Sequence, residues 1–271
     1  MDLLNYRYDK YSFTGNDGII KKILEIANIK NGFFVEFGAI DGVRGSNCRK
    51  LFEEGWSGLF IESDEKRFVQ LENNYKDHRN IITAHSTVVA EGINTFDTIC
   101  ATHMINNIDF CSIDIDGLDL EIFESIKEYL PTIVCIEGGQ MLSPFHGRVE
   151  RDIAANNIQQ SLAVINEAFN KKGYKLLCSY QYSFFIKEEF FYLFDVSTNL
   201  FDHYFNGLLV HYKRMPFIQM KLKEVGVKNQ IINEILKNSN FKKYGYHNRK
   251  RWAKKEKENI IELIKKSKND I

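Results

Sequence analysis

The sequence predicts an α/β protein built on a doubly wound, mainly parallel sheet. Within the first 140 residues, five apolar runs that read as strands alternate with segments of helical periodicity. Such alternation is typical of parallel strands joined by crossover helices. A later pair of strand-like runs with no helix between them predicts an antiparallel hairpin at one edge of the sheet. The last fifty or so residues are polar and helical in pattern, which predicts a helical C-terminal extension.

Each predicted helix begins or ends at a recognisable signal. The first has an apolar stripe of Ile and Leu, with Asn16 or Asp17 as its cap and the Asn31-Gly32 pair as its stop. Ser46 is a predicted N-cap, Gly55 ends the same helix, and Pro131 follows a later one. The predicted helices are 16–31, 46–54, 65–75, 95–102, 118–129 and 152–171.

The predicted strands are short apolar runs rich in β-branched and aromatic residues. Most are bounded by Gly, Asn or acidic residues, which favour turns. They are 33–39, 58–63, 80–89, 108–117, 132–137, a long strand 174–186 and a last strand 208–212. A soft domain boundary near 213 separates the predicted catalytic domain, 1–213, from the extension, 214–271.

Composition narrows the class of protein. Lys and Arg number 36 and Asp and Glu number 36, so the formal net charge is zero. From Lys242 onward, eleven basic residues stand against four acidic ones, and this basic end suits either an anionic partner or a solvated helix. We expect a cytoplasmic protein, because the five scattered cysteines suit a reducing compartment and no apolar run is long enough to span a membrane.

The glycine turn after the first strand indicates a nucleotide site. Glu36, Gly38, Asp41 and Gly42 fit an acid-x-Gly-x-x-x-Gly type of loop, and about twenty residues later the second strand ends in Glu62. Strand, glycine turn, helix, strand and acid is the Rossmann-like layout that places a ribose between loop and carboxylate. An ionised carboxylate accepts hydrogen bonds from both ribose hydroxyls.

Four of the five predicted strand ends carry carboxylates, and ligands of open parallel sheets bind at that edge. Two acids beside the glycine turn would repel a pyrophosphate and favour a cationic ligand. This argues against a dinucleotide such as NAD. The strand ends are Glu36–Gly42, Glu62–Asp64, His85–Ser86, Asp114–Gly117 and Glu137–Gly139.

Three blocks of the sequence resemble FkbM-type S-adenosylmethionine-dependent methyltransferases. They are Val35–Gly42 with Ser46-Asn47, Gly55–Glu62, and Asp109–Glu121. The family usually has Asp-apolar-Glu-Gly-x-Glu in the third block, so Asp116 and Asp119 are shortened forms of its glutamates. The resemblance covers roughly residues 30–140, and residues 190–271 match no family that we can name.

The resemblance implies S-adenosylmethionine as cofactor and roles for particular residues. Glu36 and Gly38 would lie under the methionine part, Asp41 and Gly42 near its amino group and sugar, and Glu62 on the ribose hydroxyls. Ser86, with His85, would flank the adenine. The predicted cofactor-binding set is Glu36, Gly38, Ala39, Asp41, Gly42, Ser46, Glu62, Ser63 and Ser86.

The resemblance also implies a sugar or glycoconjugate acceptor, such as a capsule or surface-polysaccharide precursor. Methylating a hydroxyl requires a base or a metal, because an alcohol keeps its proton at neutral pH. The predicted catalytic residues are Asp114, Asp116 and His146. Asp114 and Glu137, at adjacent strand ends, would hold a divalent cation such as Mg²⁺, although Gly138 replaces the Asn or Asp that often follows the second acid in related enzymes.

Other interpretations stay open at this point. One is methylation of a nitrogen or of nucleic acid, but no Asn/Asp-Pro-Pro-aromatic motif follows the fourth strand and basic residues gather only in the tail, so we predict no nucleic-acid partner. Another is a non-catalytic cofactor-binding partner protein. Arg148 and Arg151 suit either an anionic acceptor or plain solvent exposure. A homodimer is one option for the oligomeric state.

Overall fold

The computed structural model describes residues 1–139, 147–150 and 159–210, with side chains at 205 and 208–210 excepted. Its centre is one seven-stranded sheet in the order β3-β2-β1-β4-β5-β7-β6. The strands are β1 (Phe33–Phe37), β2 (Ser57–Glu62), β3 (Ile81–His85), β4 (Phe110–Ile113), β5 (Ile133–Glu137), β6 (Tyr174–Ser179) and β7 (Tyr182–Lys187). The first five pair in parallel and β7 is antiparallel to both neighbours. The predicted Rossmann-like sheet with an antiparallel edge hairpin is therefore confirmed.

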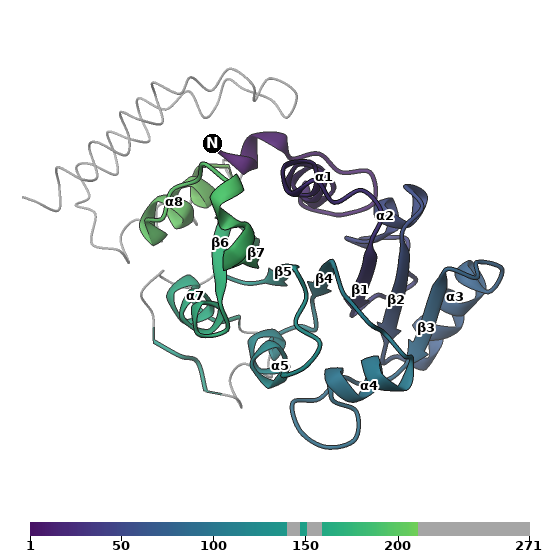
Figure 1. Cartoon of the computed structure of the whole chain (residues 1–271). Coiled ribbons are helices and arrows are strands. Elements are labelled where there is room, and N and C mark those ends of the chain that lie inside the picture. The colour runs from purple at the N-terminus through teal and green to yellow at the C-terminus, as the bar shows by residue number, and fades with distance from the viewer. Residues whose placement is uncertain (140–146, 151–158, 211–271) are drawn as a thin grey trace, which may run out of the picture.

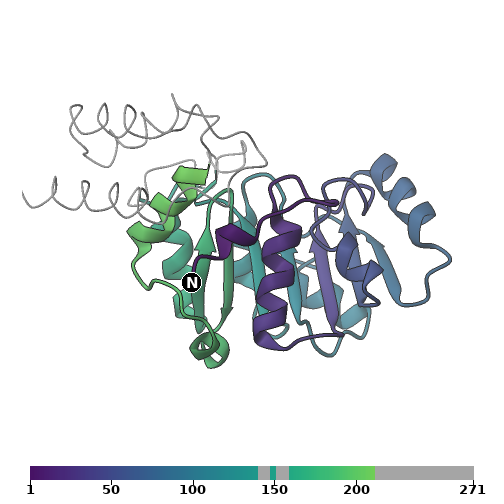
Figure 2. The ribbon, with the colours of Figure 1, turned by 90° about the horizontal axis from the view of Figure 1, so that it is seen from above.

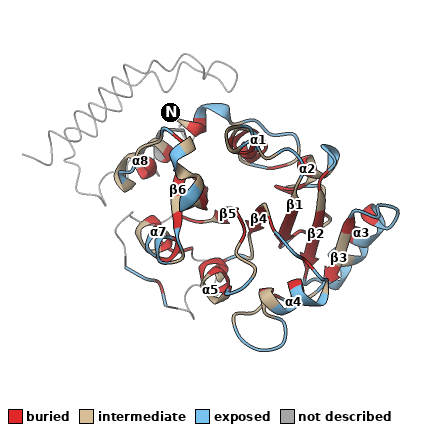
Figure 3. Cartoon of the chain, in the orientation of Figure 1, coloured by how far each residue is buried: buried red, intermediate tan, exposed pale blue. Residues whose placement is uncertain are grey.

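Helices cover both faces of this sheet (Figures 1 and 2). On one face lie η1 (Leu3–Tyr6), α1 (Asn16–Ala27), α2 (Arg49–Glu53), α3 (Glu65–Tyr75) and η2 (Glu188–Leu193). On the other lie α4 (Phe96–Thr102), α5 (Asp119–Ser125) and α7 (Leu162–Lys171), with α8 (Leu200–Val210) beside β6. The strands between them are almost entirely buried (Figure 3), as expected when both faces of a parallel sheet are covered.

Several helix boundaries differ from the prediction because the chain uses other caps. α1 ends at Ala27, where Asn28 takes a left-handed conformation and its N–H closes the helix, four residues before the predicted stop. α2 begins at Arg49 with Cys48 at the N-cap position, but the capping hydroxyl is that of Ser46, which accepts the Cys48 and Arg49 N–H groups at 3.2 and 2.9 Å. α5 ends at Ser125, well before Pro131.

The edge hairpin comes from a different part of the sequence than predicted. The run 174–186 is not one long strand, because the chain reverses at Tyr180 and Gln181 and returns as β7. The Gln181 carbonyl accepts the Gly138 N–H at 3.0 Å, which ties this reversal to the end of β5. The predicted strand 208–212 was wrong over residues 208–210, which belong to α8.

No helix within the described ranges is long and apolar enough to cross a lipid bilayer. All five cysteines are buried and carry free thiols. The predicted extension 214–271, the predicted helix start at 152 and His146 lie outside the described residues.

Candidate functional site

The carboxyl ends of the parallel strands bring most of the predicted site residues to one edge of the sheet. Glu62 at the end of β2 is level with His85 at the end of β3. Phe37, just before the glycine turn, is level with Ile113, just before Asp114. Ile113 is in turn level with Ile136, just before Glu137. The register therefore aligns five loops that are distant in sequence.

Glu36 faces inward from β1 and is 4% exposed. Its carboxyl group accepts hydrogen bonds from the Ser46 hydroxyl at 2.5 Å and from the Asn47 N–H at 2.7 Å. Burial raises the pKa of Glu36 to about 7, and the hydrogen bonds offset only part of that effect. Glu36 and Ser46 thus bind one another and hold the loop before α2.

The Asn47 side chain extends this buried polar network across the face of the sheet. Its amide donates to the Ser112 hydroxyl at 2.9 Å and accepts from the Asn16 amide at 2.9 Å. Ser112 lies level with Glu36 in the β1–β4 pairing. The network links the start of α1 to β1 and β4 directly beneath the predicted site.

The glycine turn of residues 38–42 has an unusual backbone that its neighbours enforce. Gly38 has φ +75°, and a Cβ there would lie 1.8 Å from the Asp114 carbonyl oxygen, so this glycine is required by the approach of β4. Ala39 is buried and its N–H donates to the Ile61 carbonyl at 3.2 Å. Ile40 has φ +55°, which is rare for a β-branched residue and indicates a strained turn.

Glu62 is 3% exposed, and backbone groups surround its carboxylate. One oxygen accepts the Ile40 N–H at 2.7 Å, and the other accepts the N–H groups of Ser63 and Asp64, both at 2.8 Å. A carboxylate offers about four acceptor positions, and three are used here. Glu62 therefore ties the glycine turn to the start of α3, and its predicted ribose contact stays a prediction.

Asp41 also serves the backbone: one carboxylate oxygen accepts the N–H groups of Val43 at 2.9 Å and Arg44 at 2.8 Å. At the end of β3, the ring of His85 stacks on Phe68, with centroids 4.9 Å apart, and its Nε2 lies 3.0 Å from the Ser63 carbonyl. Ser86 differs from these residues, because its hydroxyl oxygen is buried and has no hydrogen-bond partner among the described residues.

Asp114 and Glu137 form a half-buried acid pair at the ends of β4 and β5. Burial raises the pKa of Asp114, and burial together with the charge of Asp114 raises the pKa of Glu137 to about 8. The two neighbouring acids therefore take up protons more readily than isolated carboxyl groups.

Two residues that the sequence analysis missed hold this pair. The Tyr182 hydroxyl donates to Asp114 at 2.5 Å, and the Gln159 amide donates to Glu137 at 2.5 Å. Tyr182 is level with Glu137 in the antiparallel β5–β7 pairing. A hairpin in place of the predicted strand 174–186 would have placed Tyr182 beside Glu137.

The acid pair also belongs to a possible ligand set for a cation. One oxygen each from Asp114, Asp116 and Glu137 lies within 4.8 Å of the others. Asp116 is exposed, with φ +63°, whereas Asp119 is buried and accepts the N–H groups of Ile115 and Gly117 at 2.8 Å. Burial raises the pKa of Asp119 to about 6. Carboxylate oxygens grouped in this way suit Mg²⁺ or Ca²⁺.

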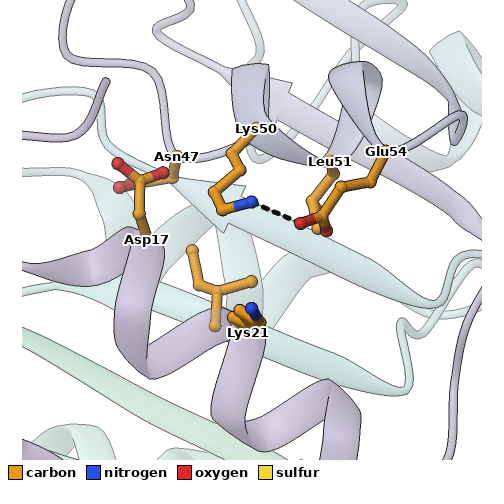
Figure 4. Close-up of a pocket in the computed structure, with 7 residues that line it drawn as sticks. Asp17, Lys21, Asn47, Lys50, Leu51 and Glu54 are labelled. Atoms are coloured by element: carbon orange, nitrogen blue, oxygen red, sulfur yellow. Dashed lines mark hydrogen bonds and ion pairs between the residues drawn. The ribbon is translucent and has the colours of Figure 1, made fainter. Parts of the chain in front are cut away.

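Other candidate groups lie elsewhere. Arg148 pairs with Glu124, whose carboxylate faces both terminal nitrogens of the guanidinium, while Arg151 and His146 fall outside the described residues. A small open depression lies between α1 and α2 (Figure 4), and its volume is about 180 Å³ including the solvent at its opening. The ion-paired side chains of Lys50 and Glu54 lie at its wall, away from the carboxyl ends of the strands. It is therefore not the predicted site.

No protein-family model matches the chain, and the search of curated proteins found no match. Solved structures similar to the chain are methyltransferases at low identity. A protein from Galdieria sulphuraria described as a sarcosine dimethylglycine methyltransferase is 12% identical, with 93% of this chain and 80% of that one covered and a TM-score of 0.43. A TehB-like S-adenosylmethionine-dependent methyltransferase from Corynebacterium glutamicum is 12% identical, with coverages of 66% and 89% and a TM-score of 0.42.

A third similar structure is the N-terminal domain of EvdMO1, determined in the presence of S-adenosylhomocysteine and D-fucose. It is 11% identical, with 63% of this chain and 80% of that one covered and a TM-score of 0.42. The FkbM subtype stays a prediction from the sequence blocks.

Proposed function

We propose that the chain is an S-adenosylmethionine-dependent O-methyltransferase that acts on a sugar or glycoconjugate. One observation carries the proposal. The strand ends that meet at the carboxyl edge of the Rossmann-like sheet carry carboxylates and Ser86 in place of Lys or Arg. That edge is where such sheets bind ligands. Its charge favours a sulfonium and an ammonium over phosphates.

The backbone after the glycine turn favours the methyl donor over a dinucleotide. Dinucleotide sites place the pyrophosphate on the N-terminus of a helix that follows the turn directly. Here α2 begins only at Arg49, seven residues after Gly42. The intervening loop is instead fixed to Glu36 through Ser46 and Asn47.

The residues present would fit the adenosyl part of the donor. Ser86 has an unpaired, buried hydroxyl oxygen at the end of β3, next to the stacked His85 and Phe68 rings. A buried hydroxyl without a partner is unfavourable by about 1–3 kcal/mol, so a ligand hydrogen bond there would restore what the protein lacks. Glu62 keeps one acceptor position for a ribose hydroxyl.

Transfer to an alcohol requires little chemistry from the protein. The acceptor oxygen forms a bond to the methyl carbon as the carbon–sulfur bond breaks, and the sulfonium becomes a neutral thioether. We assign Asp114 as the group that takes the hydroxyl proton, because it directly follows β4 at the carboxyl edge and the Tyr182 hydroxyl donates to its carboxylate. A divalent cation held by Asp114, Asp116 and Glu137 would supply further acidification of the hydroxyl when bound.

Calorimetric titration of S-adenosylmethionine and of NAD tests the cofactor assignment. The wild type should bind the former alone. Ser86→Ala should weaken binding by about three- to tenfold without loss of thermal stability, because the hydroxyl has no partner to lose. Thr87→Ala, at the exposed next residue, is the matched control and should bind normally. Binding of NAD, or of neither ligand, would reject the assignment.

Transfer of a labelled methyl group across an acceptor panel tests the reaction. The panel holds nucleotide-activated sugars, oligosaccharides, amines, tRNA and DNA. We expect label in a sugar hydroxyl, and expect Asp114→Asn to abolish it while donor binding persists. Label in a nitrogen or in nucleic acid would replace the sugar assignment. Donor binding with no transfer to any class would favour a non-catalytic role.

A further inference from the structure

Two consecutive residues at the C-terminal end of α3 donate hydrogen bonds to the glycine turn. The Asn74 side-chain amide donates to the carbonyl oxygen of Asp41 at 2.8 Å, and the Tyr75 hydroxyl donates to the carbonyl oxygen of Gly42. Each donor lies 33 residues after its acceptor, so neighbouring donors meet neighbouring carbonyls. We call Asn74 and Tyr75 the α3 clamp.

Packing reinforces these hydrogen bonds. A Cβ on Gly42 would lie 2.5 Å from the Tyr75 ring and 2.6 Å from Leu71, so the turn rests directly on α3. Tyr75 is 2% exposed, and its hydroxyl accepts a hydrogen bond from Arg49 at 3.2 Å. The Tyr75 hydroxyl is therefore hydrogen-bonded both to Arg49 of α2 and to the turn.

The turn requires such support because its conformation is unfavourable alone. Gly38, Ile40 and Gly42 all have positive φ, at 75°, 55° and 70°. Strained backbone persists only where the surrounding structure holds it. Glu62 holds the Ile40 N–H from the β2 side, and the α3 clamp holds the next two carbonyls. Glu62 therefore restrains an N–H group of the turn, and the α3 clamp restrains the carbonyl groups of the two residues that follow.

We propose that Asn74 and Tyr75 are positioning residues for the methyl donor, acting by holding the turn of residues 38–42 in its binding geometry. The inference rests on the proposed function, because it takes this turn as part of the donor site. Neither residue needs to touch the donor. Since α3 follows Glu62 and precedes β3, the helix connects the turn to the predicted ribose and adenine contacts.

Asn74 allows a test that leaves the fold intact, because its side chain is exposed. Asn74→Asp keeps the shape of the side chain and replaces the donating amide with a carboxylate that repels the Asp41 carbonyl. Asn73→Asp makes the same charge change at the exposed neighbouring position, where the side chain accepts a hydrogen bond from Lys76 just past the helix end. Comparing the two variants isolates the lost donor.

We expect Asn74→Asp to weaken S-adenosylmethionine binding by about three- to tenfold relative to Asn73→Asp, with equal melting temperatures. Hydrogen exchange at the amides of Gly42, Val43 and Arg44 should be faster in Asn74→Asp alone. A purely structural surface contact would leave affinity unchanged. Equal affinities of the two variants would overturn the inference.

The exchange experiment separates this inference from the proposed function. If the wild type fails to bind S-adenosylmethionine, the proposed function falls and the positioning role for that donor falls with it. Faster exchange in Asn74→Asp would then still establish that the α3 clamp orders the turn. Identical exchange in both variants would reject the clamp whatever ligand the turn binds.

Discussion

The buried carboxyl group of Glu36 makes the stability of the fold depend on pH, and Glu36→Gln should remove that dependence. Glutamine has the donor and acceptor layout of a protonated glutamic acid. Its oxygen would accept the Asn47 N–H, and its amide would face the Ser46 hydroxyl, whose oxygen already accepts the Cys48 and Arg49 N–H groups. The substitution therefore fixes the neutral state with little change in packing.

The magnitude follows from the shift of the pKa. Burial raises the pKa of Glu36 from its ordinary 4.5 to about 7. Between these values the folded chain binds more protons than the unfolded chain, so the free energy of unfolding falls as pH rises. The stabilising effect is fully present below 4.5 and is lost by the time pH passes 7. At 1.36 kcal/mol per pKa unit, the loss is about 3 kcal/mol.

Urea unfolding at pH 5, 6, 7 and 8, followed by intrinsic fluorescence, measures the difference between Glu36→Gln and the wild type. That difference should move in favour of the variant by about 2.5 kcal/mol across the series, because part of the total change falls below pH 5. Glu72→Gln, on the exposed face of α3, controls for the loss of one carboxyl group. A constant difference between Glu36→Gln and wild type would refute the reasoning, because it would mean that Glu36 is solvated in the fold.

Three further predictions concern the site. Gly38→Ala should destabilise the fold by about 3 kcal/mol or more, seen as a lower urea midpoint, because the new methyl group meets the Asp114 carbonyl at 1.8 Å. Ile40→Asn should stabilise it by about 0.5–1 kcal/mol in the same assay, since Asn tolerates φ +55° better. Chelation of divalent cations should stop methyl transfer but leave donor binding in calorimetry unchanged, and Mg²⁺ should restore transfer; full activity after chelation would exclude the cation.

The sequence predicts a helix or strand well where a residue next to its end determines where it begins or stops. The helix 65–75 was predicted at its observed ends, because Asp64 caps it by accepting the Arg67 N–H at 2.9 Å. The five parallel strands were also found, although most were predicted one to several residues too long. Their ends depend on where neighbouring strands stop pairing, and one sequence does not encode that information locally.

The edge hairpin shows what local signals miss. Tyr180 and Gln181 form the reversal without a Gly, Pro or Asn to mark it. The reversal depends on contacts from elsewhere, namely the Gly138 N–H and the pairing of β7 with β5. The sequence therefore predicts one strand over residues 174–186, which separates Tyr182 from the site.

The sequence predicts acids at the carboxyl edge of the sheet but does not distinguish their roles. Their hydrogen bonds divide these acids into two groups. One group accepts backbone N–H groups and so fixes loops: Glu36, Asp41, Glu62 and Asp119. Asp114 and Glu137 are held by side chains instead, through Tyr182 and Gln159. In the first group the backbone N–H groups already occupy the carboxylate oxygens, which leaves those oxygens less free to take a proton from an acceptor.

This division decides which substitutions can report on chemistry. Glu62→Ala would remove three backbone hydrogen bonds together with any ribose contact, so weaker donor binding in that variant would not identify the contact. Ser86→Ala removes a hydroxyl that has no protein partner, so an affinity change there reports on the ligand alone. By the same reasoning, Asp114→Asn is the informative change for proton transfer. Its neighbours on β5 and β7 would stay in place while the group that accepts the proton is lost.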